Sequence, residues 1–111
     1  MTSLPPFDRT GPDQGLPLVL LHGASLSRRM WTQAEARLGD LRILAPDLPG
    51  HGHRTDRFTL DQAAAEVAAL IRAEAPGGAF VGGDSLGGYV SLAVASRDPS
   101  LVRGAIVSGA T

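Results

Sequence analysis

Cysteine and lysine are both absent from this sequence of 111 residues, and its apolar runs are short. Without cysteine the chain forms no disulfide bond and has no thiolate metal ligand, which fits a reducing compartment. A membrane-spanning helix needs about 20 consecutive apolar residues, far more than any run here. The first residues also lack the basic and then apolar pattern of a secretory signal. These absences predict a soluble, cytoplasmic protein that does not bind membranes.

A strong charge imbalance is absent too. Ten basic residues, all of them arginine, stand against eleven acidic ones, and no block of like charge occurs. Electrostatics therefore gives no reason to expect nucleic acid or an anionic lipid as a partner. Hydrophobic residues make up 43% of the chain and charged residues 19%, which is typical of one globular domain with its own core.

Apolar runs separated by glycine and proline predict four buried strands that alternate with three helices. The strands are expected at residues 16–21, 42–45, 79–82 and 102–108, and the helices at residues 27–38, 60–75 and 86–97. Residues 1–15 form a polar N-terminal segment in which residues 7–9 can form at most a short edge strand. Residues 16–111 are expected to be one partial domain.

Capping residues and apolar spacing define the first helix. Ser27 is expected to cap its N-terminus through the side-chain hydroxyl, and Gly39 to end it. Trp31, Ala34 and Leu38 fall on one face at spacings of three and four, so we expect this face in the core.

The second and third helices show different patterns. Thr59 and Gln62 have the spacing of a capping box, in which each side chain satisfies a backbone N–H of the first turn. The helix that follows has a predicted buried stripe made of Leu60, Ala64, Val67 and Ile71. Residues 86–97 are apolar nearly all round, which is typical of a helix with little solvent contact.

This alternation predicts an α/β protein with a parallel sheet and helices on both faces. In such sheets ligands bind at the carboxyl ends of the strands. Three glycine-bearing segments follow strands and so share that edge: residues 22–24, 47–52 and 83–88.

Together these segments resemble the amino-terminal half of an α/β-hydrolase fold. The matching residues are His22-Gly23, Asp47-Leu48-Pro49-Gly50-His51-Gly52 and Gly83-Asp84-Ser85-Leu86-Gly87-Gly88, each after its strand, and the resemblance runs from about residue 16 to residue 111. It implies that Ser85 is the catalytic nucleophile and that the N–H groups of Ala24 and Leu86 form the oxyanion hole. It implies a small-molecule substrate, no cofactor and no metal, and the substrate-binding residues stay unassigned.

A sharp strand-to-helix turn explains the residue types around Ser85. Such a turn strains the backbone at the serine and leaves no room for side chains at Gly83 and Gly87. The helix that begins beside Ser85 aims free N–H groups and the positive end of its dipole at the site. We expect this arrangement to favour negative charge on a substrate oxygen.

Other polar residues in these segments have structural interpretations. The resemblance implies that His22 shapes its loop. Asp47 is expected to hydrogen-bond its own turn, as aspartates in turns do. His51 and His53 are expected to be solvated or to brace their loop, since no third ligand accompanies them at metal-binding spacing. Asp84 is expected to point away from the nucleophile.

No histidine follows Ser85 anywhere up to Thr111. A serine nucleophile needs a base and an orienting acid, which in this fold come later in the chain. Asp98 is the one later acid, and the intervening helix places it about 20 Å away. We therefore expect the isolated chain to be inactive, and its missing half to be a second polypeptide, a second copy or sequence beyond Thr111.

Three functional hypotheses remain open. The first, which we prefer, is a serine hydrolase of esters or related acyl compounds. The second keeps the fold but changes the reaction to that of a haloperoxidase, an acyltransferase, a carbon–carbon bond hydrolase or a lyase. The third is a non-catalytic binding module built on half of the fold.

Overall fold

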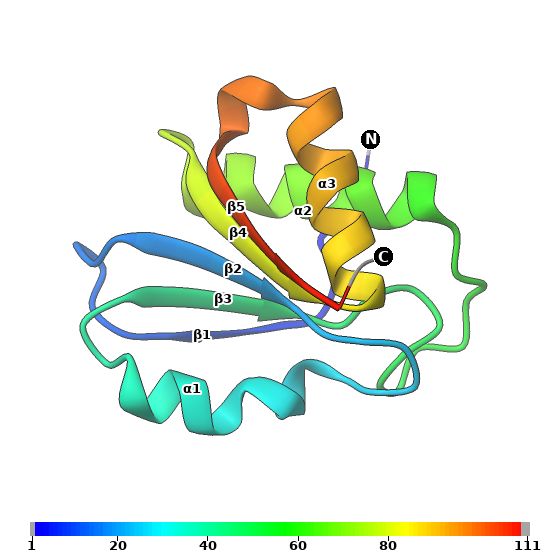
Figure 1. Ribbon diagram of the computed structural model, residues 1–111, viewed down its shortest axis with the longest axis horizontal. Helices are drawn as coiled ribbons and strands as arrows, with labels where there is room; N and C mark the ends of the chain where they lie inside the picture. The colour runs from blue at the N-terminus through cyan, green and yellow to red at the C-terminus, as the bar shows by residue number, and fades with distance from the viewer. Residues whose placement is uncertain (1, 110–111) are drawn as a thin grey trace.

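The computed structural model describes residues 2–109, which form a five-stranded sheet with helices on both faces (Figure 1). The strands are β1 (Phe7–Thr10), β2 (Pro17–Leu21), β3 (Arg42–Pro46), β4 (Ala79–Asp84) and β5 (Val102–Ser108). Their order across the sheet is β1-β3-β2-β4-β5. β1 pairs antiparallel with β3, and all the other pairs are parallel. The predicted α/β class, with its mostly parallel sheet, is confirmed.

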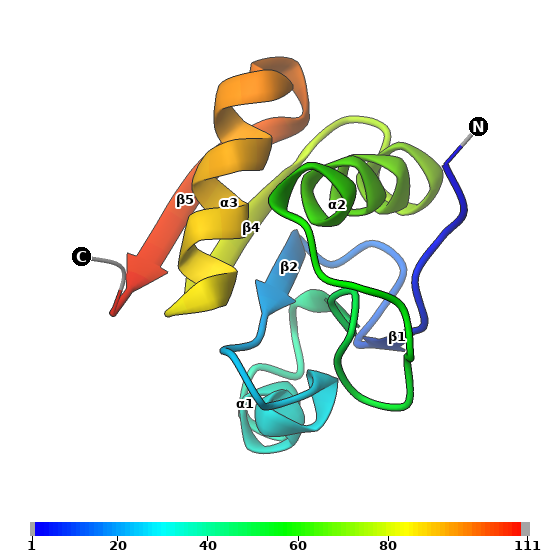
Figure 2. The same ribbon diagram turned by 90° about the vertical axis from the view of Figure 1, so that its right-hand side faces the viewer.

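The helical segments lie on opposite sides of this sheet. They are η1 (Arg28–Trp31), α1 (Thr32–Arg37), α2 (Leu60–Glu74), α3 (Leu86–Arg97) and η2 (Pro99–Leu101), of which η1 and η2 are short 3-10 helices. Figure 2 shows α1 below the sheet, with α2 and α3 above it. None of the helices within residues 2–109 is long and apolar enough to cross a membrane.

The core lies between the sheet and the α2/α3 layer. Alternate residues of β2 point to opposite faces, so Val19 and Leu21 enter this core and are fully buried. They pack with apolar residues of β3, β4, α2 and α3: Leu44, Val81, Val67, Ile71, Val90 and Val94. This packing fixes the strand ends that carry the candidate site.

The first helix differs from its prediction. Ser27 does act as an N-cap, because its hydroxyl accepts a hydrogen bond from Arg29 N, but the segment splits into η1 and the short α1. The prediction that Trp31, Ala34 and Leu38 lie in the core is wrong, since no residue of α1 is buried and Leu38 is 42% exposed. These side chains do not pack tightly on the sheet, because a hollow lies between the sheet and the segment formed by η1 and α1.

This hollow is apolar and has a volume of about 440 Å³. It is lined mainly by Leu18, Leu20, Met30, Trp31, Leu38, Gly82 and Ile106. Ile106 on β5 is 67% exposed, although β5 is a sheet strand. The α1 face of the sheet is therefore only partly covered within the described residues.

The α2 helix follows its predicted cap in part. Thr59 caps it by accepting a hydrogen bond from Gln62 N, but the Gln62 amide turns away to Asp56 and Glu66, so the reciprocal half of the capping box does not form. Three members of the predicted stripe are buried, whereas Leu60 in the first turn is 41% exposed.

The α3 helix has the predicted bounds, but the expectation of little solvent contact is wrong. Val90 and Val94 are fully buried against the sheet and α2. Tyr89 and Leu92, on another side of the helix, are 44% and 50% exposed. The uniform apolar pattern hides this difference because it does not say which side meets the sheet.

Candidate active site

The loops after β2, β3 and β4 meet at the carboxyl edge of the sheet. The strand register sets their positions, since Leu21 of β2 lies beside Gly83 of β4, and Asp84 lies beside Ser108 of β5. Ser85 therefore follows β4, which lies between β2 and β5, with the loop after β2 directly next to it.

Ser85 connects β4 to α3 in a strained backbone conformation. Its φ is +56° and its ψ is −114°, a region that a residue with a Cβ rarely adopts. Its N–H donates to Ser108 O at 2.8 Å, and its carbonyl accepts from Gly88 N at 2.9 Å. The turn is thus anchored on both sides, and the serine itself is exposed.

Two glycines make this turn possible by close approach of the backbone. A Cβ on Gly83 would lie 2.1 Å from Gly87 O, and a Cβ on Gly87 would lie 2.1 Å from Leu21 O. Both contacts are with backbone atoms that cannot swing aside. The predicted lack of room for side chains at these positions is confirmed.

Leu86 follows Ser85 directly in the chain, and Ala24 lies near the turn in space although it is distant in the chain. Leu86 is the first residue of α3, where the N–H has no acceptor within the helix. Gly23 packs against the serine, since a Cβ built on it would lie 3.7 Å from Ser85 Cβ. Ala24 follows Gly23 directly, so the structure brings both predicted donors to the neighbourhood of Ser85.

The peptide that ends in the Ala24 N–H is held in a defined orientation. Its carbonyl, Gly23 O, lies 2.8 Å from His22 Nδ1 and accepts a hydrogen bond from Leu26 N at 3.2 Å. Because the C=O and N–H of a trans peptide point in opposite directions, fixing the Gly23 carbonyl also fixes the Ala24 N–H. The next residue, Ser25, has a positive φ of +65°.

His22 is fully buried, and both ring nitrogens are engaged. Leu48 N–H donates to Nε2 at 3.0 Å, so Nε2 carries no proton, and the proton on Nδ1 is donated to Gly23 O. Burial lowers the pKa of His22 from its ordinary value, as does the nearby ring of His51, while Gly23 O and Asp47 raise it. His22 is therefore a neutral link between two loops, which agrees with a loop-shaping role.

Asp47 does not hydrogen-bond its own turn as the sequence predicts. Its carboxylate is 3% exposed and accepts from Arg28 N at 2.8 Å and from Arg28 Nη1 at 2.5 Å. It also packs against Gly52, where a Cβ would lie 2.4 Å from Asp47 Oδ2. The partner lies 19 positions earlier in the chain, so no local signal reveals it.

The loop after Asp47 is braced by a second ionic cluster. Arg54 donates to both carboxylate oxygens of Glu66, at 2.7 and 2.8 Å, to Asp56 at 2.6 Å and to Asp47 O at 3.0 Å. The hydrogen bonds to Glu66 and Asp56 raise the pKa of Arg54. The pKa of Asp56 is lowered mainly by the hydrogen bond from the Gly50 N–H and, to a smaller degree, by Arg54. The cluster fastens this loop to α2.

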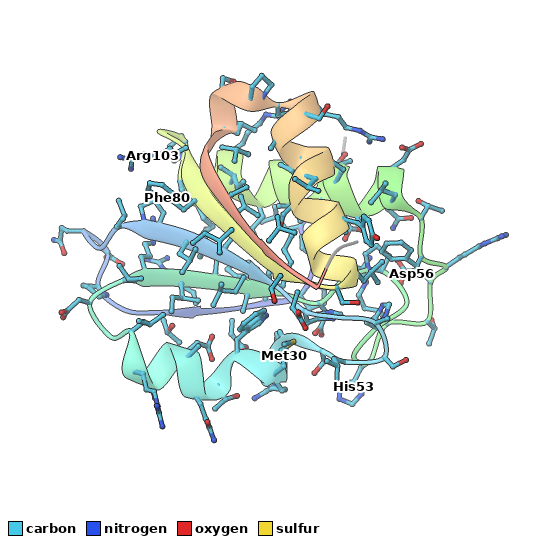
Figure 3. The ribbon with its side chains drawn as sticks, in the orientation of Figure 1. Met30, His53, Asp56, Phe80 and Arg103 are labelled. Carbon is cyan, nitrogen blue, oxygen red and sulfur yellow. The ribbon has the colours of Figure 1, made fainter. Side chains whose placement is uncertain are left out.

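The two later histidines also have structural surroundings. His51 Nδ1 lies 2.9 Å from Pro49 O, and its ring packs against His22 and Phe58. His53 is exposed in the same loop (Figure 3). Within residues 2–109, no group of three or more histidine, aspartate and glutamate side chains is placed to hold a metal ion.

Two acids, Asp84 and Asp98, lie next to the two ends of α3. Asp84 directs a carboxylate oxygen toward Gly109, where a Cβ would lie 3.1 Å from it. Asp98 lies at the opposite end of α3 from Ser85 and forms an ion pair with Arg72 at 3.0 Å. Asp98 is therefore remote from Ser85, as predicted, whereas the orientation of Asp84 relative to the Ser85 hydroxyl stays a prediction.

A hollow of about 520 Å³ opens beside the loop that carries Ala24. It is lined by Ser25, Leu26, Ser27, Arg29, Met30, Gly52 and His53. Figure 3 shows Met30 and His53 at this end of the molecule. Leu26 and Met30 are thus exposed to this hollow.

Comparison with known proteins identifies the family. Residues 18–111 match the profile of the Alpha/beta hydrolase family. An AB hydrolase superfamily protein from Gibberella zeae is 38% identical over 114 residues, covering 98% of this chain and 40% of that protein. An esterase from Mycobacterium tuberculosis is 39% identical over 89 residues, covering 77% of this chain and 30% of that protein.

A solved structure is also similar to this chain. The structure of a thermophilic esterase from Thermogutta terrifontis matches with a TM-score of 0.83 and 34% identity, covering 92% of this chain and 39% of that one. The chain therefore belongs to the alpha/beta hydrolase family. It spans 30 to 40% of the length of these three proteins.

Proposed function

We propose that this chain is the nucleophile-bearing part of a serine hydrolase that acts on an ester or a related acyl compound. The observation that supports it most is the strained, exposed Ser85 between β4 and α3, at the edge where the parallel strands end. Strain of this kind persists only where the surrounding structure holds it, and it clusters at functional sites. The two esterases among the relatives favour the same reaction class.

In this proposal each residue has a defined role. The Ser85 hydroxyl attacks the acyl carbonyl carbon, and a base takes its proton. The carbonyl oxygen becomes an anion that accepts hydrogen bonds from Ala24 N–H and Leu86 N–H. The leaving alcohol departs with the proton from the base, and water then releases the acyl group from Ser85.

We assign the base and its orienting acid to a part of the hydrolase outside this chain. Both nitrogens of His22 are occupied by loop contacts, and Asp98 is at the far end of α3. The remaining hydrolase segment, or a second copy of the chain, would complete the site and cover the apolar hollow on the α1 face. A cytoplasmic location stays a prediction from the sequence.

Covalent labelling tests the role of Ser85. In the catalytically complete protein, with the remaining segment supplied, a fluorophosphonate probe is expected to modify the peptide that contains Ser85, as read by mass spectrometry. Ser85→Ala should abolish this adduct, and Ser96→Ala, an exposed serine on α3, should retain it. The 111-residue chain alone should show no turnover, and an undiminished adduct in Ser85→Ala would falsify the assignment.

A further inference from the structure

The loop that carries Ala24 is tied to the loop after β3 at both of its ends. At the first end, Leu48 N–H donates to His22 Nε2 at 3.0 Å. At the second end, Arg28 binds the Asp47 carboxylate through its backbone N–H, at 2.8 Å, and through Nη1, at 2.5 Å. Residues 23–27, which include the proposed oxyanion donor, lie between these two ties.

The second tie is rigid because of its charges and its burial. Asp47 is almost fully buried, and a buried carboxylate is stable only when it is paired and hydrogen-bonded. Arg28 satisfies both oxygens and also binds Asp8 on β1, through Nε at 3.0 Å. The guanidinium is thus held between carboxylates from two different elements, β1 and the loop after β3.

The segment between the ties needs such support. Ser25 has a φ of +65°, a conformation that a residue with a side chain keeps only when its surroundings impose it. Ser25 lies between Ala24 and Arg28, so release of Arg28 allows this residue to relax. Relaxation would rotate the peptide planes on either side and move the Ala24 N–H.

We propose that Asp47 is a positioning residue for the Ala24 N–H, acting through Arg28. The inference deepens the proposed function, on which it rests, since it assigns a task to a carboxylate that touches neither Ser85 nor the substrate. The two oxygens of Asp47 each accept a hydrogen bond from Arg28. A side chain with a single acceptor at residue 47 would leave one of these hydrogen bonds unmade.

Asp47→Asn is the sharpest test, because the amide keeps the size of the carboxylate. Its oxygen still accepts from Arg28 N, while its NH₂ group meets Arg28 Nη1 donor to donor. We expect kcat, and the rate of Ser85 phosphonylation, to fall about 10- to 100-fold with KM changed less than about twofold. Arg28→Gln should act alike, and the double variant should be no worse than either single variant.

The matched control removes an ion pair at the other end of the sheet. Glu74 binds Arg42, the first residue of β3, at 3.2 Å, and both side chains are partly buried. Glu74→Gln should lower the unfolding temperature without changing the reactivity of Ser85 by more than about twofold. If the reactivity of Ser85 fell only because the protein is less stable, Glu74→Gln would lower it as well.

A second measurement reads the position without any chemistry. In the folded 111-residue chain, the amide resonances of Ala24 and Ser25 should shift and exchange faster in Asp47→Asn, but not in Glu74→Gln. Unchanged amides, or a phosphonylation rate within twofold of the parent, overturn the proposal. If Asp47→Asn does not fold, Arg28→Lys takes its place, and unchanged amides there overturn it too.

Failure of the proposed function has a different signature. An unlabelled Ser85 in the complete parent protein removes the serine-hydrolase assignment, whereas the amide measurement still decides whether Asp47 sets the position of Ala24.

Discussion

The turn at Ser85 depends on glycines that touch backbone atoms. The Cβ that alanine would add at Gly87 falls 2.1 Å from the carbonyl oxygen of Leu21, a buried strand residue. Relief of such an overlap requires α3 to move away from β2, which breaks packing that buries Val90 and Val94. The glycine is therefore a structural requirement of the strand-to-helix turn.

We predict that Gly87→Ala costs about 3 kcal/mol or more in the free energy of unfolding, because the overlap involves rigid backbone. The matched control is Gly77→Ala, where a Cβ would meet nothing within 4 Å. That change should stay within about 0.5 kcal/mol. Urea unfolding followed by circular dichroism compares the two, and equal midpoints would show that the overlap is relieved without cost.

Individual residues also define how far sequence reasoning reaches into the site. Ser85 could be chosen because a short glycine motif marks it, and Ala24 and Leu86 because the resemblance to a known fold implies them. The contact of Arg28 with Asp47 could not, since it joins positions 19 apart and depends on how two loops fold over the sheet edge. Tertiary ion pairs of this kind leave no local pattern in a single sequence.

At the scale of elements, the loops after β2 and β3 act as a unit joined by His22. The bond from Leu48 N–H to Nε2 exists only while Nε2 is unprotonated. Protonation in the buried site would break it and leave a charge without water around it, which is why burial lowers the pKa of His22.

We predict that stability falls with acidity through this histidine. The folded pKa lies below the ordinary value of 6.5, so the unfolded chain takes up the proton first. The contribution of neutral His22 is complete above pH 6.5 and is lost as the pH falls toward the folded pKa. Thermal unfolding between pH 7.5 and pH 5 measures it.

The control for this pH dependence is His22→Gln, which does not titrate. Its unfolding midpoint should be lower at pH 7.5, and it should fall less than the parent between pH 7.5 and pH 5. If the midpoint temperatures of the parent and the variant fall equally over this range, the pH dependence does not come from His22.

The elements themselves were predictable where their signals are local. The bounds of α3 and β5 agree with the sequence, because Pro99 and the apolar run after it mark them clearly. The structure of the segment from Ser27 to Leu38 could not be predicted, since a helical spacing does not reveal a switch from 3-10 to α geometry. Its apolar face is exposed because burial depends on what lies opposite, which the spacing does not encode.

At the scale of the whole molecule, the two faces of the sheet differ in coverage. The α2/α3 face encloses the core, whereas the α1 face keeps a hollow of about 440 Å³, with Ile106 at 67% exposure. A second apolar hollow of about 220 Å³ continues it past Leu18 and Phe80, where Arg103 lies over the Phe80 ring. Exposed apolar side chains that gather on one face of a sheet can favour association.

We predict that the 111-residue chain associates as its concentration rises, and that Ile106→Thr weakens this association several-fold, because it removes apolar surface while keeping a β-branched side chain. Leu60→Gln is the control, since Leu60 is exposed on α2 outside the hollow. Analytical ultracentrifugation across a range of concentrations measures both. A chain that sediments as a monomer throughout would contradict the prediction.

The hydrogen bond from Ser85 N–H to Ser108 O has a practical consequence for dividing the molecule. The backbone of the proposed nucleophile is hydrogen-bonded to the last residue of the neighbouring strand β5. If the protein is divided into two fragments that reassemble, Ser108 should therefore stay in the same fragment as Ser85. A junction placed before Val102 would put Ser85 and Ser108 on different pieces, and the reassembled protein would have to form this hydrogen bond between the two pieces.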